Sequence, residues 1–205
     1  MKNFFVDVAL FVLFVAEMCF LFLPKILHEI LGVAMFALII FHVAINGRRF
    51  LSLTKKFTPK KFLSVALNVA LTICAAIIFM SGVCMSNYLF VDVISAELQR
   101  NMTIHQLHVA APYVMMILIG GHIGLHWREL FQRFFKRREK FLLATAVILS
   151  AIGAYGLYLN RVADRIMMKH IFATPATELP AIIFALMIVG GVALFALITV
   201  LLNRK

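Results

Sequence analysis

Charged residues are scarce in this sequence, and their scarcity decides the class of protein. Only 14% of the 205 residues are charged, whereas 63% are hydrophobic. Ordinary globular chains are about 25% charged and about 45–50% apolar. A soluble core of this length could not hide so much apolar surface. The composition therefore excludes a cytosolic enzyme, a secreted domain and a disordered chain, and indicates an integral membrane protein.

Cysteine is scarce as well. The three cysteines, Cys19, Cys74 and Cys84, show no CxxC spacing, and each lies in or at the end of an apolar run. This pattern argues against a disulfide framework, because such a framework needs regularly spaced pairs. Small buried hydrophobic residues are the better interpretation.

Six apolar runs are long enough to cross a bilayer, for which a helix needs roughly 20 residues. We therefore predict an all-α integral membrane protein built as a six-transmembrane helix bundle. The first run is interpreted as a retained span and not as a signal peptide, because Glu17 interrupts it and no A-x-A cleavage site follows. The predicted spans cover residues 4–23, 27–46, 62–84, 104–127, 141–159 and 180–202.

Basic residues gather on one side of the predicted bundle. That side carries 15 of the 20 Lys and Arg, in the two connectors 47–61 and 128–140 and near both termini. By the positive-inside rule it faces the cytoplasm, so both termini are expected to be cytoplasmic. The net charge of +11 then needs no nucleic-acid partner, and the basic connectors are placed to contact membrane lipid headgroups.

Histidine is the chemistry-bearing residue inside the spans, where an ionisable group marks a functional site by default. Six of the seven histidines fall in spans two and four. His28 and His42 are 14 residues apart, and so are His108 and His122. Fourteen residues bring a helix to within about 40° of four full turns and rise about 21 Å. Each pair therefore shares one helix face, with one histidine near each membrane surface.

The two helices match in depth. His42 lies six residues before Arg48, and His122 lies six residues before Arg128. Haem iron needs only two axial ligands from the protein, whereas a zinc site needs three or four converging ones. The pattern predicts two bis-histidine b-type haems in the bundle. The predicted iron ligands are His28 and His108 for the outer haem, and His42 and His122 for the inner haem.

Neighbouring residues leave alternatives open. His105 and His126 each lie one turn from a predicted ligand and are possible substitutes for it. Thr103 and Gln106 match a capping box, which places His105 in the wetter first turn of span four. Glycines let a porphyrin approach a helix closely, and the alternative role of these glycines is helix–helix packing. Arginines could bind the haem propionates. The candidates for these roles are Gly32, Gly120, Gly121, Gly124, Arg48, Arg49 and Arg128.

Two further groups of polar residues have open roles. Glu17 either relays protons or meets a quinone near the outer haem, or else it pairs with Lys25 or a hydroxyl group. The residues Asp164, Arg165 and His170 are interpreted as solvated members of the last outer connector.

A resemblance to the flavinylation-associated cytochrome family rests on three segments. They are LHEILGVAMFALIIFHVAINGRRF (27–50), MSGVCMS (80–86) and HQLHVAAPYVMMILIGGHIGLHW (105–127). They resemble the family's His-Glu-x-x-Gly start, its second histidine followed by Asn, its Ser-Gly turn and its final His-rich helix. The match covers about half of the chain, residues 25–127.

The resemblance implies a dihaem cytochrome b of the bacterial cytoplasmic membrane. It implies a four-helix, cytochrome b-like haem core at residues 1–130 and a two-helix C-terminal extension at residues 131–205. Such a protein passes electrons between a quinol pool or redox subunit and an extracytoplasmic, flavin-bearing partner. It is an electron-transfer subunit rather than a stand-alone enzyme.

Two functions of other classes compete with the electron carrier. A metal transporter would use the histidine clusters together with acidic companions, for which only Glu17 and Glu29 are candidates. A haem-free anchor of a redox complex would need no ligands at all.

The charge distribution generates a prediction about topology. A reporter fused after Lys205 should read cytoplasmic, and one inserted near Arg165 should read external, because the basic connectors stay inside. Paired activity assays with reporters that work on only one side of the membrane check this. The opposite result at either site would contradict the six-span topology.

Overall fold

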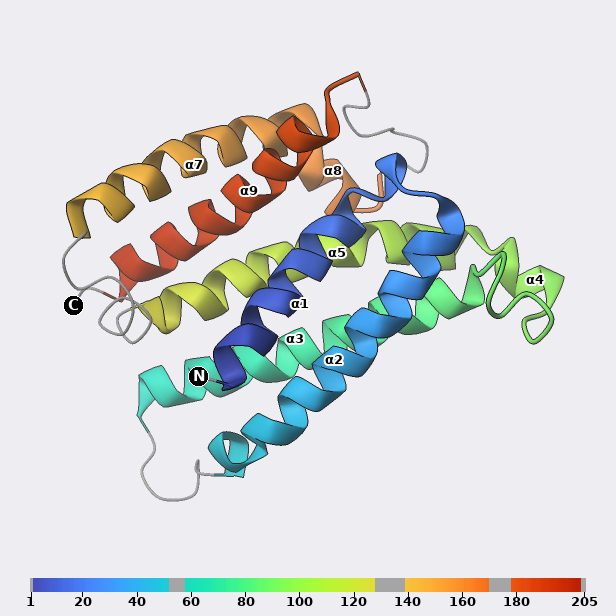
Figure 1. Cartoon of the computed structure of the whole chain (residues 1–205), viewed down its shortest axis with the longest axis horizontal. Helices are drawn as coiled ribbons and strands as arrows, with labels where there is room; N and C mark the ends of the chain where they lie inside the picture. Colours follow the sequence, from blue (N-terminus) through green and yellow to red (C-terminus); the bar gives the residue numbers. More distant parts are fainter. Residues whose placement is uncertain (1, 52–57, 128–138, 170–177, 204–205) are drawn as a thin grey trace. The chain divides into compact units, whose positions relative to one another are not determined.

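A computed structural model describes residues 2–51, 58–127, 139–169 and 178–203 of the chain, which are helical and contain no strand (Figure 1). Within these ranges, five helices are long and apolar enough to cross a membrane. This confirms the predicted class, an all-α protein with several membrane-spanning helices. The five are α2 (Lys25–Leu51), α3 (Pro59–Cys84), α5 (Met102–Leu125), α7 (Glu139–Leu159) and α9 (Ala181–Leu202).

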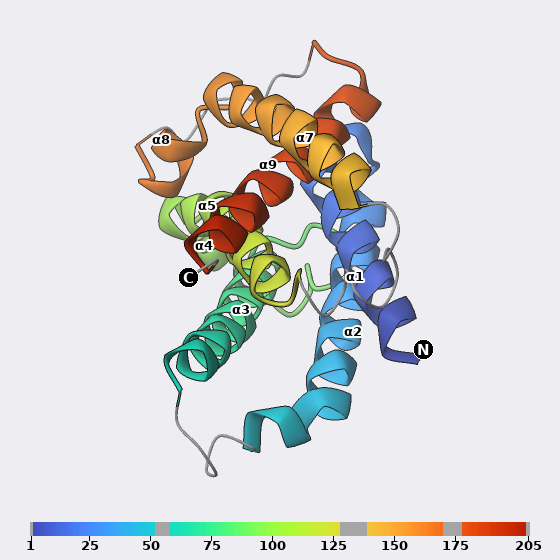
Figure 2. The ribbon, with the colours of Figure 1, turned by 90° about the vertical axis from the view of Figure 1, so that its left-hand side faces the viewer.

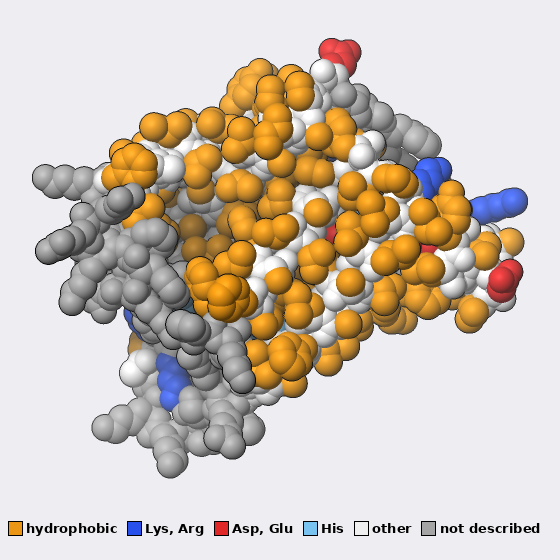
Figure 3. Space-filling view, in the orientation of Figure 1, with side chains coloured by type: hydrophobic (Ala, Val, Ile, Leu, Met, Phe, Trp, Pro, Cys, Tyr) orange, Lys and Arg blue, Asp and Glu red, His pale blue; other side chains and the backbone are white. Residues whose placement is uncertain are grey.

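The surface of these helices suits lipid. Large apolar side chains such as Ile73, Ile148 and Ile182 are exposed, and hydrophobic side chains cover most of the visible surface of the helices in Figure 3. Exposed apolar area on this scale is not a property of soluble monomers. The helices are therefore expected to contact the hydrocarbon chains of a bilayer.

The predicted first span is not one helix of spanning length. Helix α1 (Lys2–Met18) has 17 residues, and the short 3₁₀ helix η1 (Phe20–Phe22) follows it. At 1.5 Å per residue, α1 is about 26 Å long, somewhat shorter than the roughly 30 Å of a bilayer core. A sixth crossing would need α1 and η1 together, and it stays a prediction.

A tight turn folds α1 back onto α2, so the two helices lie antiparallel and side by side (Figures 1 and 2). In this turn, the Phe22 N–H donates to the Cys19 carbonyl and the Leu23 N–H to the Phe20 carbonyl. The Pro24 carbonyl then accepts the first hydrogen bonds of α2. The antiparallel arrangement places the polar residues of α1 beside those of α2.

The chain divides into two compact units, residues 1–112 and 113–205. The boundary falls inside α5, at Pro112. Unit 1 holds α1, α2, α3, the short α4 (Ala96–Gln99) and the first part of α5, and unit 2 holds the rest. The predicted division at residues 130 and 131 rests on the resemblance alone and stays a prediction.

Helix α5 begins differently from the prediction. Its N-cap is Asn101, whose Oδ1 accepts hydrogen bonds from the N–H groups of Thr103 at 3.0 Å and Ile104 at 3.2 Å. The predicted capping box at Thr103 and Gln106 is therefore wrong, because an asparagine two residues earlier already satisfies these donors. His105 still lies in the first turn, where its N–H donates to the Asn101 carbonyl.

Glycines bring the helices of unit 2 into backbone contact. Helices α7 and α9 lie side by side (Figures 1 and 2). A Cβ added at Gly153 of α7 would lie 2.1 Å from the carbonyl carbon of Gly190 in α9. Gly120 and Gly124 of α5 also face α9, where an added Cβ would lie 2.6 Å from the Cβ of Phe195 and from the carbonyl oxygen of Ala196, respectively. Helix packing thus accounts for these two glycines.

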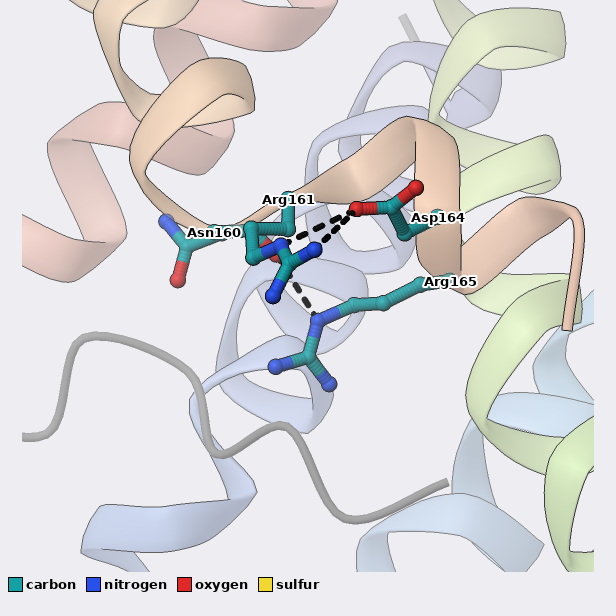
Figure 4. A network of polar contacts seen from close by, with 4 residues as sticks. All are labelled: Asn160, Arg161, Asp164 and Arg165. Atoms are coloured by element: carbon teal, nitrogen blue, oxygen red, sulfur yellow. Dashed lines mark hydrogen bonds and ion pairs between the residues drawn. The ribbon is translucent and has the colours of Figure 1, made fainter. Parts of the chain in front are cut away.

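A polar network joins the end of α7 to the short helix α8 (Val162–Ile166), as Figure 4 shows. Arg161, in the left-handed conformation with φ of 49°, pairs with Asp164 at 2.9 Å. The Nε of Arg165 donates to the Asn160 carbonyl at 2.8 Å, and its Cζ lies 5.9 Å from the centroid of the Tyr113 ring.

The expectation that Arg165 is a solvated connector residue is therefore wrong, because the Asn160 carbonyl and the Tyr113 ring replace water around a side chain that is only 5% exposed. The exposed neighbour Lys169 is the better site for an external topology label.

The contact between α7 and α9 generates a stability prediction. A Gly153→Ala substitution should destabilise the chain by about 1–3 kcal/mol or more, because overpacking a helix contact displaces backbone. Gly47→Ala is the matched control, since its added Cβ meets no described atom within 4 Å and alanine favours a helix. Thermal unfolding in detergent checks both. Equal unfolding temperatures for the two variants would contradict the packing assigned to Gly153.

Candidate functional site

The structure brings together the two histidines predicted for the outer haem. His28 lies in the first turn of α2, and His108 lies in the second turn of α5. Their ring centroids are 6.2 Å apart, and the ring planes make an angle of 80°. Metal–imidazole bonds are about 2.0–2.1 Å long, so two rings that share one metal have centroids about 6 Å apart. The spacing of the two rings therefore fits one axially ligated iron between them.

Helix α3 fixes the ring of His108. Its Nδ1 lies 3.1 Å from the Ile78 carbonyl oxygen and 3.1 Å from the Ser81 hydroxyl. A carbonyl can only accept, so Nδ1 must carry the proton and Nε2 must carry the lone pair. The Ser81 hydroxyl in turn donates to the Ile77 carbonyl at 2.6 Å, which leaves its oxygen free to accept from Nδ1. This network sets the tautomer that a metal-ligating Nε2 requires.

Gly82 makes room for the same ring. A Cβ at this position would lie 3.0 Å from Cε1 of His108, a distance at which the ring would have to move. Ser81 and Gly82 form the Ser-Gly pair of the resembling segment, and they lie inside the last turns of α3. The expected Ser-Gly turn is therefore wrong, and the pair instead positions a histidine of another helix.

Glu17 meets the other histidine of this pair. Its Oε2 lies 2.8 Å from Nδ1 of His28, and its side chain is only 11% exposed. The distance is that of an ion pair, although among the described residues neither Nδ1 nor the Glu17 Oε1 has an aligned hydrogen bond. Glu17 is thus beside a predicted ligand. Gly32 contacts the same carboxylate, since a Cβ there would lie 3.6 Å from Oε2.

A second carboxylate of α1 meets the second histidine of α2. Oδ1 of Asp7 lies 3.1 Å from Nδ1 of His42, and the Asp7 side chain is 53% exposed. The sequence analysis did not single out Asp7. The signal was present, because a tight turn makes spans one and two antiparallel and so places residues of like depth side by side.

The predicted inner partner of His42 lies in unit 2. There the ring centroids of His122 and His126 are 5.0 Å apart, so the alternate ligand lies directly beside the predicted one. The pairing of His42 with His122 would join the two units and stays a prediction. Gly121 is buried in α5. The side chain of Arg48 and the whole of Arg128, both assigned to haem propionates, lie outside the described residues.

Glu29 anchors the outer connector between α3 and α5. Its carboxylate accepts hydrogen bonds from the Ser86 hydroxyl at 2.7 Å and from the N–H groups of Asn87 at 2.7 Å and Leu89 at 2.9 Å. The Ser86 oxygen also accepts from the Phe90 N–H at 2.9 Å. This connector runs directly into α5, so Glu29 holds the chain on which His108 is carried.

The arrangement of ligating side chains is pairwise. Over residues 2–51, 58–127, 139–169 and 178–203, no group of three or more His, Cys, Asp and Glu is placed to hold a metal ion. A pair of imidazoles is what a haem takes from a protein, because the porphyrin supplies the other four ligands.

Comparison with known proteins adds no relative: no family model, no curated protein and no solved structure matches the chain. The resemblance to flavinylation-associated cytochromes therefore stays a prediction that rests on the residues quoted for it.

The contacts of Glu29 generate a prediction about the outer connector. Glu29→Ala should speed amide hydrogen exchange at residues 86–90, because the N–H groups of Asn87 and Leu89 lose their acceptor. Glu97→Ala is the matched control, since Glu97 is an exposed glutamate of the same connector. Hydrogen-exchange mass spectrometry of the purified variants checks this. Equal exchange of this segment in both variants would show that Glu29 is not the anchor.

Proposed function

We propose that the protein is a transmembrane dihaem b-type cytochrome that passes electrons across the bacterial cytoplasmic membrane. One observation carries the proposal: the rings of His28 and His108 lie with centroids 6.2 Å apart and planes at 80°, and Nδ1 of each ring lies beside a polar atom of a neighbouring helix. Both Nε2 atoms are then left for one iron. A haem bound there supplies one-electron chemistry, since its iron alternates between the ferric and ferrous states.

The chain's own residues orient the ligands. Ile78 and Ser81 hold His108 in one tautomer, and the Glu17 carboxylate lies 2.8 Å from Nδ1 of His28. The part of α5 that follows His108 is packed among apolar side chains. Ala110 and Ala111 are buried there, and the Cys74 thiol donates to the Ala111 carbonyl. A water-poor setting limits the reorganisation that accompanies a change of charge at the iron.

The inner haem is proposed from the same pattern. His42 meets Asp7 as His28 meets Glu17, so the two histidines of α2 have alike surroundings. His122 is the proposed partner, and Arg48 and Arg128 are the proposed propionate contacts. The stacked rings of Phe36 and Phe79, 4.0 Å apart, lie on α2 and α3 between the depths of His28 and His42 and separate the two levels with apolar side chains.

The membrane arrangement belongs to the same proposal. With α1 and η1 crossing together, the chain makes six spans with both termini in the cytoplasm, as the basic connectors require. The outer haem then lies beneath the connector 85–101, where an extracytoplasmic flavoprotein or other redox subunit would dock. A quinol pool or a redox subunit supplies the electrons.

One of the two acidic residues that a metal transporter would use is bound elsewhere. Glu29 is engaged by four donors of the outer connector and is not free to line an ion path. Glu17 is beside His28. No observation favours this alternative or the haem-free anchor over the cytochrome.

Haem content tests the ligand assignment. The purified wild-type chain should hold two haems, and His42→Ala or His122→Ala should hold only the outer one, because a lost axial ligand removes its haem. His28→Ala or His108→Ala should hold only the inner one. His105→Ala and His126→Ala are the matched controls and should keep both. Unchanged haem content in all four ligand variants would overturn the assignment.

A further inference from the structure

Glu17 places a largely buried carboxyl group beside His28. Its side chain is 11% exposed, its Oε2 lies 2.8 Å from Nδ1 of His28, and its Oε1 has no hydrogen-bond partner among the described residues. No Lys or Arg in the described part of the chain pairs with it. An ionised carboxylate that is buried without a positive charge beside it is costly, so a cationic neighbour would favour the ionised form of Glu17.

A ferric bis-histidine haem on His28 would be such a neighbour. Ferric iron inside a doubly negative porphyrin carries one net positive charge, whereas the ferrous centre is neutral. A carboxylate that accepts from Nδ1 of an axial histidine also raises the basicity of that ligand. Both effects favour the ferric state.

The two predicted ligands of the outer site differ in the charge of the group beside their Nδ1 atoms. Neutral acceptors, a backbone carbonyl and a hydroxyl, hold His108, whereas a buried carboxylate meets His28. At the inner level, Asp7 meets His42 at the longer distance of 3.1 Å, and its side chain is 53% exposed rather than buried. The carboxylate effect should therefore be larger at the outer haem than at the inner one.

On the basis of the proposed function, we propose that Glu17 is a positioning residue that orients His28 and lowers the reduction potential of the outer haem. Asp7 has the same relation to His42 with a smaller effect. Helix α1 thereby orients the two predicted ligands of α2 and sets the reduction potentials of their haems.

Redox titration of the purified chain in detergent tests this, with the outer and inner haems distinguished in His42→Ala and His28→Ala backgrounds. Glu17→Gln keeps the size and an acceptor oxygen but removes the charge, and it should raise the potential of the outer haem and shift its ferric electron paramagnetic resonance signal. Glu17→Asp keeps the charge and should stay closer to wild type. Asp7→Asn, the matched control on the same helix, should leave the outer haem unchanged.

The outcomes separate the inference from the function on which it rests. A wild-type chain without haem would overturn the proposed function itself. A chain with two haems, whose outer potential is the same in wild type and Glu17→Gln, would overturn only the role of Glu17, as would an equal shift in Glu17→Asp. If Glu17→Gln binds the outer haem too weakly for titration, haem affinity replaces potential as the readout. If haem affinity falls by about 10–100-fold in Glu17→Gln but stays near the wild-type value in Glu17→Asp, the role is supported. If haem affinity falls equally in both variants, the role is contradicted.

Discussion

A polar side chain inside a bilayer must find a polar partner within the protein, and unit 1 is organised around this requirement. Two helices satisfy it for the outer histidine pair: α1 presents Glu17 to His28, and α3 presents Ile78 and Ser81 to His108. Each contact uses Nδ1 and leaves Nε2 available. Were either contact absent, the ring could rotate or change tautomer, and the pair would lose the geometry that a shared iron needs.

The same requirement explains why the motif-bearing residues converge at one end of unit 1. Glu29 follows His28 directly in the sequence, yet it points to the connector that leads into α5. Ser81 and Gly82 belong to α3, yet they shape the place of the His108 ring. The segments that resemble flavinylation-associated cytochromes therefore contain predicted ligands together with residues that contact them, which a list of histidines alone does not reveal.

Five of the six spans and the closeness of His28 to His108 could be predicted, because hydrophobic length and a 14-residue helical spacing are regular quantities that survive folding. The partners of these histidines could not, since they depend on the rotation of neighbouring helices about their axes. The sequence left the role of Glu17 open between a proton relay or quinone contact and a pair with Lys25 or a hydroxyl group, and Asp7 was not singled out as a partner of His42. Asn101, and not Thr103, caps α5. Arg165 is buried and donates to the Asn160 carbonyl, although its sequence neighbours are those of a polar connector. Gly120 and Gly124 pack against α9, a contact between helices distant in sequence.

The central claim is that facing imidazoles hold haem iron, and the absorption difference spectrum of the purified wild-type chain tests it most directly. The chain is expressed with haem available, isolated in detergent, and recorded before and after reduction with dithionite. Our account predicts the sharp reduced α and β bands of bis-histidine haem b, with intensity equivalent to two haems per chain. A folded chain whose spectrum shows no such bands would contradict it.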